Sequence, residues 1–319
     1  MKSKKIYIAG HTGMVGTAIT KYLNYKGYNN LILRTKAELN LINQQQVNKF
    51  FEEEHPEIVI LVAGRVGGIE ANRKYPAEFI YQNIMMWTNI ISAASNNNVK
   101  KLIFLGSATV YPKTAQVPYK EEYLLSGPFD KNVEPYAIAK ISAIKLCETL
   151  YKQNGNNFFT ITLANLYGPY DHFDNEDAHV VPSLISKIYD AKTKGIDRVE
   201  LWGTGKPTRD LLFVEDLADA IEYLLNTVDA KHIFDQGISH INIGTGNEIT
   251  IHELTKYISS NLDYNGTFFF NSAKPDGPMR KVVDISRINN LGWKANTSLY
   301  EGIKKTCDYY LKLKIDNSG

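Results

Sequence analysis

The stretch Lys5-Ile-Tyr-Ile-Ala-Gly10-His-Thr-Gly13-Met-Val-Gly16 decides the fold. Its first five residues are a short apolar run, which predicts a buried strand. Three glycines with the spacing G-x-x-G-x-x-G follow, and a helical pattern then continues through Leu23. Glycines allow a close approach of the backbone to a phosphate, and a helix N-terminus offers free N–H groups and a positive dipole. The stretch therefore predicts a dinucleotide-binding turn, with a tight turn that binds no ligand as the alternative.

Arg34 stands at the end of the next predicted strand, residues 31–33. Sites for NAD usually place Asp or Glu near this point, where it binds the ribose 2′-hydroxyl. A guanidinium suits a 2′-phosphate instead, so the sequence favours NADPH as the cofactor. A solvated arginine at a strand end is the alternative interpretation. Leu39, Asn40 and Leu41 come next, and we predict that they flank the adenine.

Strand-like and helix-like patterns alternate along the first half of the chain. Apolar runs too short for most helices predict further strands at 58–62, 101–105 and 158–163. Longer patterns predict helices at 46–54, 76–98 and 135–154. Such alternation is typical of a parallel sheet covered by helices on both faces. We therefore expect an α/β protein with a Rossmann doubly wound parallel sheet and a smaller α/β substrate-binding lobe.

Several candidate residues follow directly after predicted strands. They are the glycine turn, Arg34, Gly64, Ser107 and Asn165. In doubly wound sheets, ligands bind beyond the carboxyl ends of the strands. The shared placement therefore predicts one site at one edge of the sheet, and this prediction does not depend on any single motif.

Tyr136 and Lys140 are four residues apart in the segment Glu134-Pro-Tyr-Ala-Ile-Ala-Lys140. Pro135 fits the first turn of a helix, where its missing N–H is not needed. Residues four apart on a helix stack on one face, about 6 Å apart. A nearby ammonium favours phenolate and lowers the pKa of a tyrosine toward working pH. The pair predicts an acid or base, and Ser107 is placed to hydrogen-bond the same oxygen. A surface tyrosine beside a lysine is the alternative.

The bulk properties of the 319 residues exclude several classes of protein. The net charge is +2 without a basic cluster, so nucleic acid is not an expected partner. No apolar run reaches the ~18 residues of a membrane span, and Met1–Lys5 lead straight into a strand. Cys147 and Cys307 lie far apart, so we expect two reduced, buried thiols rather than a disulfide. We predict a cytoplasmic protein with no metal site.

The pattern becomes less regular after Leu166, which marks an approximate boundary between two parts of the chain. We predict an NADP-binding domain of residues 1–165 plus about 213–246, and a substrate lobe of about 166–212 plus 247–315. Patterns in this second half predict helices at 183–194, 214–225, 250–262 and 299–313. They predict strands at 199–202, 209–213, 241–243 and 266–270.

Nine segments spread over nearly the whole chain resemble the GDP-L-fucose synthase family of the extended short-chain dehydrogenase/reductases. Its members are 3,5-epimerase/4-reductases of GDP-4-keto-6-deoxy-D-mannose. The His-Val-x-Pro and Trp-Gly-Thr-Gly segments are more specific than the motifs common to the superfamily. The nine segments are Gly10–Gly16, Gly67–Asn72, Phe79–Asn83, Tyr136–Lys140, Asn165–Pro169, His179–Pro182, Trp202–Gly205, Pro207–Arg209 and Lys274–Gly277.

The resemblance implies NADPH as cofactor and a GDP-linked 4-keto-6-deoxy sugar as substrate. It implies that Tyr136 protonates the C4 oxygen as hydride arrives. Lys140 would hold the nicotinamide ribose and tune Tyr136, and Ser107 would polarise the ketone. The residues implied to contact the cofactor are Gly10, Thr12, Gly13, Met14, Val15, Gly16, Arg34, Leu39, Asn40, Leu41, Ala63, Gly64, Leu105, Gly106, Tyr136, Lys140, Leu163, Asn165, Leu166 and His179.

The resemblance also implies a set of residues that contact the GDP-sugar. The planar guanidinium of Arg209 matches phosphate oxygens, and Trp202 offers an apolar face. Surface ion pairs for Arg209 and Lys187, and a core position for Trp202, are the alternatives. The whole implied set is Ser107, Asn165, Val180, Lys187, Trp202, Arg209 and Asp276.

Thr109 departs from the family pattern in a chemically important way. Bifunctional members carry a cysteine two residues after the serine, and it works with the histidine that corresponds to His179 to move protons at C3 and C5. A thiol with a pKa near ~8.5 exchanges protons near neutrality, whereas an unperturbed threonine hydroxyl does not. His179 is present, either as a substrate contact or as a surviving acid or base. The substitution predicts a reductase whose epimerase activity is weak or lost.

Three functions are therefore open at this point. The first is NADPH-dependent C4 reduction of a GDP-4-keto-6-deoxy hexose or heptose, for nucleotide-sugar and surface-polysaccharide synthesis. The second is a full epimerase/reductase that makes GDP-L-fucose or a close relative. The third is a non-catalytic, cofactor-binding protein, against which the complete set of Ser107, Tyr136 and Lys140 argues. The resemblance also implies a homodimer paired through the helices around Tyr136 and residues 76–98.

Overall fold

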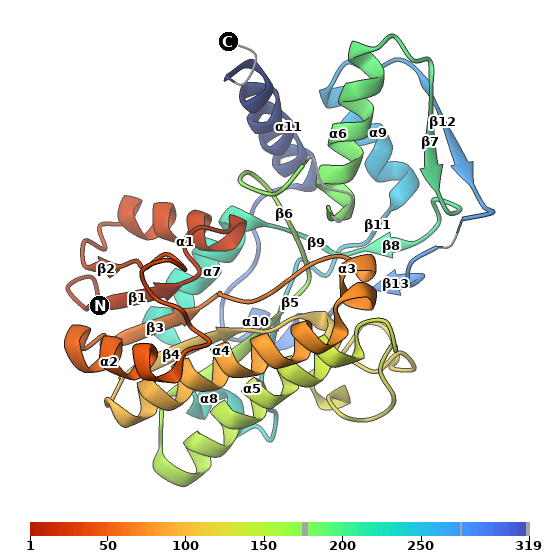
Figure 1. Cartoon of the computed structure of the whole chain (residues 1–319). Helices are drawn as coiled ribbons and strands as arrows, with labels where there is room; N and C mark the ends of the chain where they lie inside the picture. The colour runs from red at the N-terminus through yellow and green to blue at the C-terminus, as the bar shows by residue number, and fades with distance from the viewer. Residues whose placement is uncertain (174–177, 275, 317–319) are drawn as a thin grey trace.

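A computed structural model of the chain describes residues 1–173, 178–274 and 276–316. Six parallel strands form its main sheet in the order β10-β5-β4-β3-β1-β2 (Figure 1). They are β1 (Ile6–Ala9), β2 (Leu31–Ile32), β3 (Ile58–Leu61), β4 (Lys101–Leu105), β5 (Phe158–Leu163) and β10 (Ile241–Ile243). The predicted doubly wound α/β fold is confirmed, and each of these strands lies within one residue of its predicted limits.

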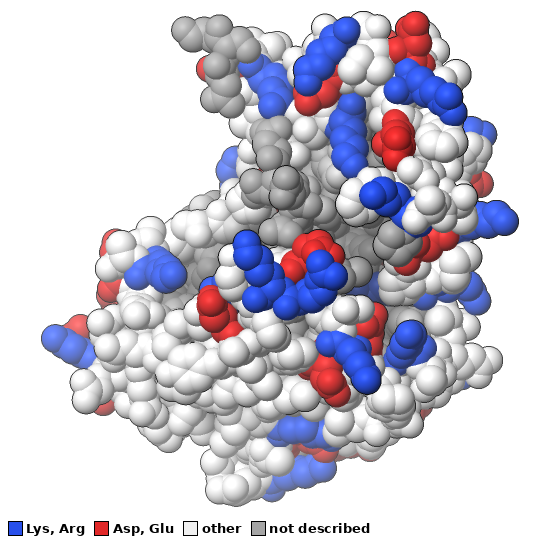
Figure 2. Space-filling view, turned by 45° about the vertical axis from the view of Figure 1, so that its right-hand side comes forward, with Lys and Arg blue, Asp and Glu red and all other residues white. Residues whose placement is uncertain are grey.

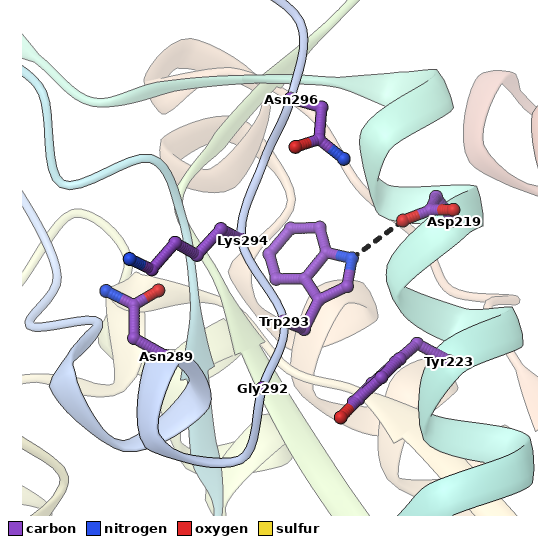
Figure 3. Close-up of a pocket in the computed structure, with 7 residues that line it drawn as sticks. All are labelled: Asp219, Tyr223, Asn289, Gly292, Trp293, Lys294 and Asn296. Atoms are coloured by element: carbon purple, nitrogen blue, oxygen red, sulfur yellow. Dashed lines mark hydrogen bonds between the residues drawn. The ribbon is translucent and has the colours of Figure 1, made fainter.

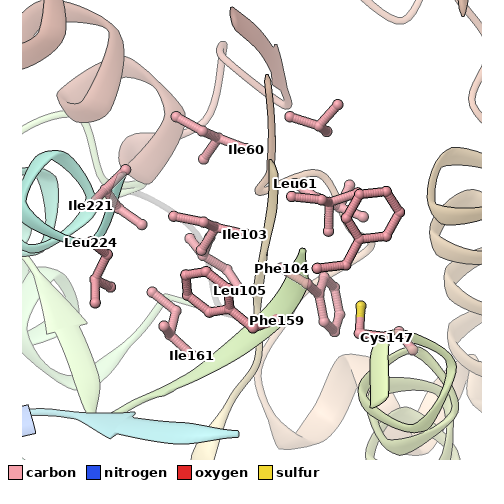
Figure 4. Packing of buried hydrophobic residues seen from close by; sticks show 14 of the residues in the cluster. Ile60, Leu61, Ile103, Phe104, Leu105, Cys147, Phe159, Ile161, Ile221 and Leu224 are labelled. Atoms are coloured by element: carbon pink, nitrogen blue, oxygen red, sulfur yellow. The ribbon is translucent and has the colours of Figure 1, made fainter. Parts of the chain in front are cut away.

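Helices cover both faces of this sheet, which explains why nearly all residues of its strands are buried. α1 (Met14–Tyr25) packs against α7 (Val214–Thr227), and α4 (Pro76–Asn96) contacts both α2 (Gln44–Glu54) and α5 (Glu134–Asn154). In Figure 4, Ile221 and Leu224 of α7 lie on one side of the strand residues, and Cys147 of α5 lies on the other. The chain therefore forms three layers around one large core.

A second group of elements lies beyond the carboxyl edge of the sheet (Figure 1). It has its own buried cluster, in which Leu184 and Ile188 of one helix pack with Leu254 and Ile258 of another. Its helices are α6 (Val180–Thr193), α9 (Ile251–Asn261) and α11 (Leu299–Asp316). Its strands are β6 (Asn165–Tyr167), β7 (Arg198–Trp202), β8 (Thr208–Arg209), β9 (Leu211–Phe213), β11 (Ile249–Thr250), β12 (Thr267–Asn271) and β13 (Arg280–Lys281).

The two buried clusters bear on the predicted division of the chain. Val283, Ile288 and Trp293 pack into the larger cluster, although the predicted substrate lobe includes them. α10 (Ser286–Asn290) carries Ile288 and contacts β10 of the main sheet. We therefore propose that residues 283–293 belong with the larger domain, and the remaining limits stay a prediction.

Three local differences from the predicted elements have physical reasons. α6 begins at Val180 rather than Ser183, because Pro182 falls in the first turn, where a helix needs no N–H. The predicted strand 209–213 is split between β8 and β9 at Asp210, whose buried carboxylate accepts hydrogen bonds from Thr245 and Gly246. The short helices α3 (Ile69–Lys74), α8 (Lys231–Phe234), η1 (Ala108–Val110) and η2 (Glu121–Tyr123) were not predicted.

The molecule has a surface of mixed charge and two buried thiols. Positive and negative side chains are mixed over the face shown in Figure 2. Cys147 and Cys307 are buried and unpaired, as expected. Among the described residues, no helix combines the length and the apolar character that crossing a membrane requires.

Candidate active site

The carboxyl ends of β1, β3, β4 and β5 bring four predicted segments to one edge of the sheet. Gly10 follows β1, Ala63 and Gly64 follow β3, Gly106 follows β4, and Asn165 begins β6 shortly after β5. The backbones are held there by hydrogen bonds from Ala63 N to Ala9 O (2.7 Å) and from Gly106 N to Ile161 O (2.6 Å). The sheet therefore places these residues at one edge, as the sequence predicts.

The glycine turn between β1 and α1 is shaped by close backbone contacts. Gly10 has φ +92°, and a Cβ on it would lie 2.6 Å from Ala63 N. A Cβ on Gly16 would lie 2.1 Å from Gly10 O, so the helix could not approach the strand. Gly13, by contrast, has no neighbour closer than 3.9 Å to such a Cβ, and no side chain caps α1. The open space and free N–H groups fit a dinucleotide diphosphate.

The side chain of Arg34, which follows β2, is held in one orientation by two contacts. Its guanidinium pairs with the carboxylate of Glu54 from α2 and donates a hydrogen bond to Leu33 O (2.9 Å). The following loop is tied to α4, because Asn89 Nδ2 donates to Leu41 O at 3.0 Å. A ribose 2′-phosphate at this position would share the guanidinium with Glu54.

Tyr136 and Lys140 lie on α5 and are both buried. The Tyr136 ring contacts Phe79 and Trp87 edge-on, each at a centroid distance of 6.2 Å. Lys140 Nζ donates to Leu105 O at 2.5 Å and lies 4.1 Å from the centroid of the Trp87 ring. Burial lowers the pKa of Lys140 to about 7, because an apolar environment disfavours the ammonium.

The sequence predicts that the Lys140 ammonium lowers the pKa of Tyr136, and this prediction is wrong for the structure. Burial raises the pKa of the Tyr136 phenol above its usual value, because an apolar environment disfavours the phenolate. The lysine ammonium points at Leu105 O and lies 5.7 Å from the centroid of the tyrosine ring. Spacing along a helix predicts that two side chains share a face but does not predict how deeply the face is buried. Tyr136 is therefore a neutral phenol, the form that donates a proton.

Ser107 and Thr109 form a hydrogen-bonded pair after β4. Ser107 caps η1, and its Oγ accepts hydrogen bonds from Thr109 Oγ1 (3.1 Å) and Thr109 N (3.4 Å). The serine oxygen is thus engaged as an acceptor. Its own proton remains available to donate to a third group, such as a ketone oxygen.

His179 and Val180 mark the start of α6 at the entrance to the smaller group of elements. His179 is the N-cap residue of α6, and its side chain is 56% exposed. Its Nδ1 lies 3.9 Å from Asp171 Oδ2. Asn165, predicted to contact both ligands, donates its backbone N–H to Asp210 O at 3.1 Å.

Three of the predicted substrate residues, Trp202, Arg209 and Asp276, lie on or beside β7, β8 and β13. Asp276 accepts hydrogen bonds from Thr204 N (2.9 Å) and Thr204 Oγ1 (2.7 Å), directly after Trp202. Arg209 Nη1 donates to Pro278 O at 2.7 Å. Trp202 is 63% exposed, so it is not a core aromatic. Lys187 is exposed on α6, and Pro275 of the predicted motif lies outside the described residues.

Two residues of this region were missed by the sequence reasoning. Lys281 lies opposite Arg209 in the pairing of β13 with β8, and burial together with Arg209 lowers its pKa to about 8. Tyr119 lies close enough to Arg209 for the guanidinium charge to act on the phenol. The backbone N–H of Tyr119 donates to Val282 O, and Tyr119 O accepts from Asp284 N, at 2.8 Å each. The signal for Lys281 was the basic pair at 280–281, just after the Lys274–Gly277 motif.

A hollow on another part of the surface contains none of the predicted site residues (Figure 3). It lies between α7 and the segment 289–296. Trp293 stands in its middle and donates its indole N–H to Asp219 Oδ2 at 2.8 Å, and Tyr223 donates to Leu291 O. These contacts hold the chain after α10 against α7.

Among the described residues, no cluster of three or more His, Cys, Asp or Glu could hold a metal ion.

Known proteins share both the sequence and the fold of the chain. The family model described as "NAD dependent epimerase/dehydratase family" matches residues 6–244. GDP-L-fucose synthase 1 of Arabidopsis thaliana is 44% identical, with 98% of this chain and 94% of the relative covered. GDP-L-fucose synthase of Escherichia coli strain K12 is 43% identical, with 98% of each covered.

Solved structures agree with this assignment. A GDP-D-glycero-L-gluco-heptose synthase of Campylobacter jejuni, crystallised in the presence of NADPH, has a TM-score of 0.92 and 38% identity, covering 98% of this chain and 99% of that one. A GDP-mannoheptose C4 reductase of the same organism, with NADP bound, has a TM-score of 0.90 and 39% identity at the same coverage. The chain therefore belongs to the GDP-L-fucose synthase family, a group of NADP-dependent oxidoreductases within the NAD dependent epimerase/dehydratase family.

Proposed function

We propose that the protein uses NADPH to reduce the C4 ketone of a GDP-4-keto-6-deoxy sugar, either a hexose or a heptose. The observation that carries the proposal is the set of Ser107, Tyr136 and Lys140 at the end of β4 and the start of α5. The names of the two Campylobacter jejuni relatives, a heptose synthase and a heptose C4 reductase, support the same class of substrate.

NADPH, when bound along the glycine turn, supplies the hydride that reaches C4. The phenol of Tyr136 gives its proton to the C4 oxygen, so that the ketone becomes an alcohol and NADP⁺ is left. Ser107 donates a hydrogen bond to the same oxygen while its Oγ accepts from Thr109. Lys140 would hold the ribose of the bound cofactor. Tyr136 and Ser107 thus act on the negative charge that develops on the C4 oxygen during reduction.

The smaller group of elements supplies a cationic site for the GDP part. Arg209 and Lys281 are neighbours across β8 and β13, and burial disfavours the charge on both. A diphosphate placed between them would compensate these charges, and a guanidinium can bind phosphate oxygens with two parallel bonds. The exposed Trp202 offers a flat face for the base or sugar. Lys187 and Asp276 are proposed as flanking contacts.

We propose that C3 and C5 epimerisation is weak or absent, because Thr109 stands where the family pattern has cysteine. The threonine hydroxyl is hydrogen-bonded to Ser107 and does not exchange protons near neutrality. The bifunctional 3,5-epimerase/4-reductase remains the second candidate. It is favoured by His179, which has a carboxylate 3.9 Å from its ring.

The test of the reductase is turnover of NADPH with a panel of GDP-4-keto-6-deoxy hexoses and heptoses. Replacing Tyr136→Phe removes the proton donor, and we expect kcat to fall by about a hundredfold to ten-thousandfold. Tyr151→Phe is the matched control, because Tyr151 lies on the same helix and its hydroxyl donates to Asp235 Oδ1 on the surface (3.0 Å). A fully active Tyr136→Phe enzyme would refute the assignment of the donor.

The same panel separates the enzyme from a non-catalytic, cofactor-binding protein. Binding of NADPH without reduction of any keto sugar would favour the non-catalytic, cofactor-binding protein. We also propose that the protein works in the cytoplasm as a homodimer.

A further inference from the structure

Tyr170 and Phe173, on either side of Asp171, are both held by contacts with other elements. Tyr170 accepts a hydrogen bond from Lys21 Nζ of α1 (2.9 Å), and its ring meets Tyr309 of α11 at 5.0 Å. Phe173 is buried against Tyr310 at a centroid distance of 4.8 Å. Tyr170 also has φ +72°, which is uncommon for a residue other than glycine. The backbone at Asp171 is therefore held by both parts of the molecule.

The side chain of Asp171 is buried but only half-bonded. Its exposed fraction is 7%, and Oδ1 accepts the N–H of His172 at 2.8 Å. Among the described residues, buried Oδ2 has no hydrogen-bond partner. Buried carboxylate oxygens nearly always have a donor, so an unpaired one calls for an explanation. His179 Nδ1 lies 3.9 Å from this oxygen.

We propose that Asp171 is a positioning residue for His179. The carboxylate accepts the Nδ1 proton of the imidazole, which leaves Nε2 without a proton and able to accept a hydrogen bond. The hydrogen bond made by one ring nitrogen decides which tautomer a histidine adopts. The distance is about 1 Å longer than a hydrogen bond. The ring is 56% exposed, and contacts of this kind often tighten only when substrate binds, so we infer that the ring turns toward Asp171 in the complex.

The consequence for the reaction rests on the proposed function. An unprotonated Nε2 accepts a hydrogen bond from a hydroxyl of the sugar, so Asp171 acts on substrate affinity through His179. In this proposal Asp171 acts only through His179 and has no contact with the cofactor or the reacting carbonyl. Its loss should therefore change KM for the keto sugar more than kcat.

The tautomer is read by ¹⁵N NMR of protein labelled at histidine, without substrate, at about pH 8.5, where ordinary imidazoles are neutral. Comparison with His179→Gln assigns the His179 signals among the seven histidines. We expect mainly the Nδ1–H form in the unaltered protein, less of it in Asp171→Asn, and least in Asp171→Ala. Asp263→Ala, at an exposed acid, is the control. The same tautomer ratio in all Asp171 variants would overturn the proposal. If Asp171→Ala does not fold, the isosteric Asp171→Asn decides.

Kinetics provide the second readout. Loss of one hydrogen bond predicts a KM about three- to tenfold higher in Asp171→Ala, with kcat within about twofold. In a His179→Gln background, the same change should have little further effect. An equal effect in both backgrounds would show that Asp171 acts independently of His179. If the unaltered enzyme reduces no keto sugar, the proposed function fails, whereas the NMR result still decides the inference.

Discussion

Burial sets the protonation states of the two central side chains. Tyr136 and Lys140 lie among Phe79, Trp87 and Phe104, and this apolar setting disfavours both phenolate and ammonium. The pKa of the phenol is raised, and that of the lysine is lowered to about 7. The tyrosine keeps its proton until substrate arrives, and the lysine changes charge near neutrality.

The lowered pKa of Lys140 predicts a pH-dependent stability. An unfolded lysine binds its proton up to about pH 10, whereas the folded one releases it near pH 7. Between these values the unfolded state binds more protons, so Lys140 makes the free energy of unfolding increase with pH. We expect Lys140→Met to lose this increase in urea titrations at several pH values between 7 and 9. Lys152→Met, on the exposed side of α5, is the control; equal slopes in the Lys140→Met variant and the unaltered protein would contradict the prediction.

Substitution of Thr109 distinguishes the two candidate functions, the reductase and the bifunctional epimerase/reductase. Thr109→Cys restores the thiol of the family pattern, and we expect deuterium from heavy water to enter the sugar at C3 and C5. The unaltered enzyme should incorporate little or none, as measured by mass spectrometry of the product. Thr109→Val, which lacks both hydroxyl and thiol, controls for loss of the bond to Ser107. Rapid exchange by the unaltered protein would favour the bifunctional enzyme.

At the scale of elements, α4 and α5 each present an inner and an outer face. Their inner residues, such as Trp87 and Ile144, are buried against the sheet. Their outer faces carry apolar side chains, and Tyr81 and Ile138 are among the exposed large ones. Members of this family are expected to pair through these two helices, so the outer faces are the proposed dimer interface.

Ile138→Glu places a charge on that proposed interface. Burying an unpaired carboxylate is costly, so we expect the dimer to dissociate into monomers. Light scattering coupled to size-exclusion chromatography at micromolar concentration measures the mass. Tyr25→Glu changes an exposed aromatic on α1 in the same way and should leave the mass unaltered. The interface proposal fails if both variants keep the mass of the unaltered protein.

At the scale of the whole molecule, two buried clusters are joined by chain that crosses several times between them. Tyr136, the proposed proton donor, belongs to the larger cluster. The proposed GDP contacts lie on or beside α6, β7, β8 and β13, outside that cluster. The three tryptophans report on these parts separately. Trp87 and Trp293 are buried in the larger cluster, whereas Trp202 is exposed on the smaller group.

This distribution predicts a simple binding signal. GDP added without cofactor should change the fluorescence of Trp202, because stacking removes its indole from water. Trp202→Phe should abolish the change and weaken binding, as measured by calorimetry. Trp293→Phe is the matched control, since Trp293 is buried beside Asp219. If GDP changes the fluorescence of Trp202→Phe as much as that of the unaltered protein, contact of GDP with Trp202 is excluded.

The local patterns of the sequence determined the parallel sheet, the glycine turn and the spacing of Tyr136 and Lys140. Strand periodicity, glycine positions and helical spacing are properties of neighbouring residues, so they are readable without a structure. They also placed Arg34, Ser107 and Asn165 at strand ends, where the sheet brings them to one edge.

Only the tertiary structure decided the protonation states and the contacts between distant segments. The pKa of Tyr136 depends on aromatic residues from α4, which lie about fifty positions earlier in the chain. The pairing of Lys281 with Arg209 and the approach of Asp171 to His179 depend on how strands and loops meet. Desolvation and electrostatic contact act through space, so no pattern of neighbouring residues predicts them.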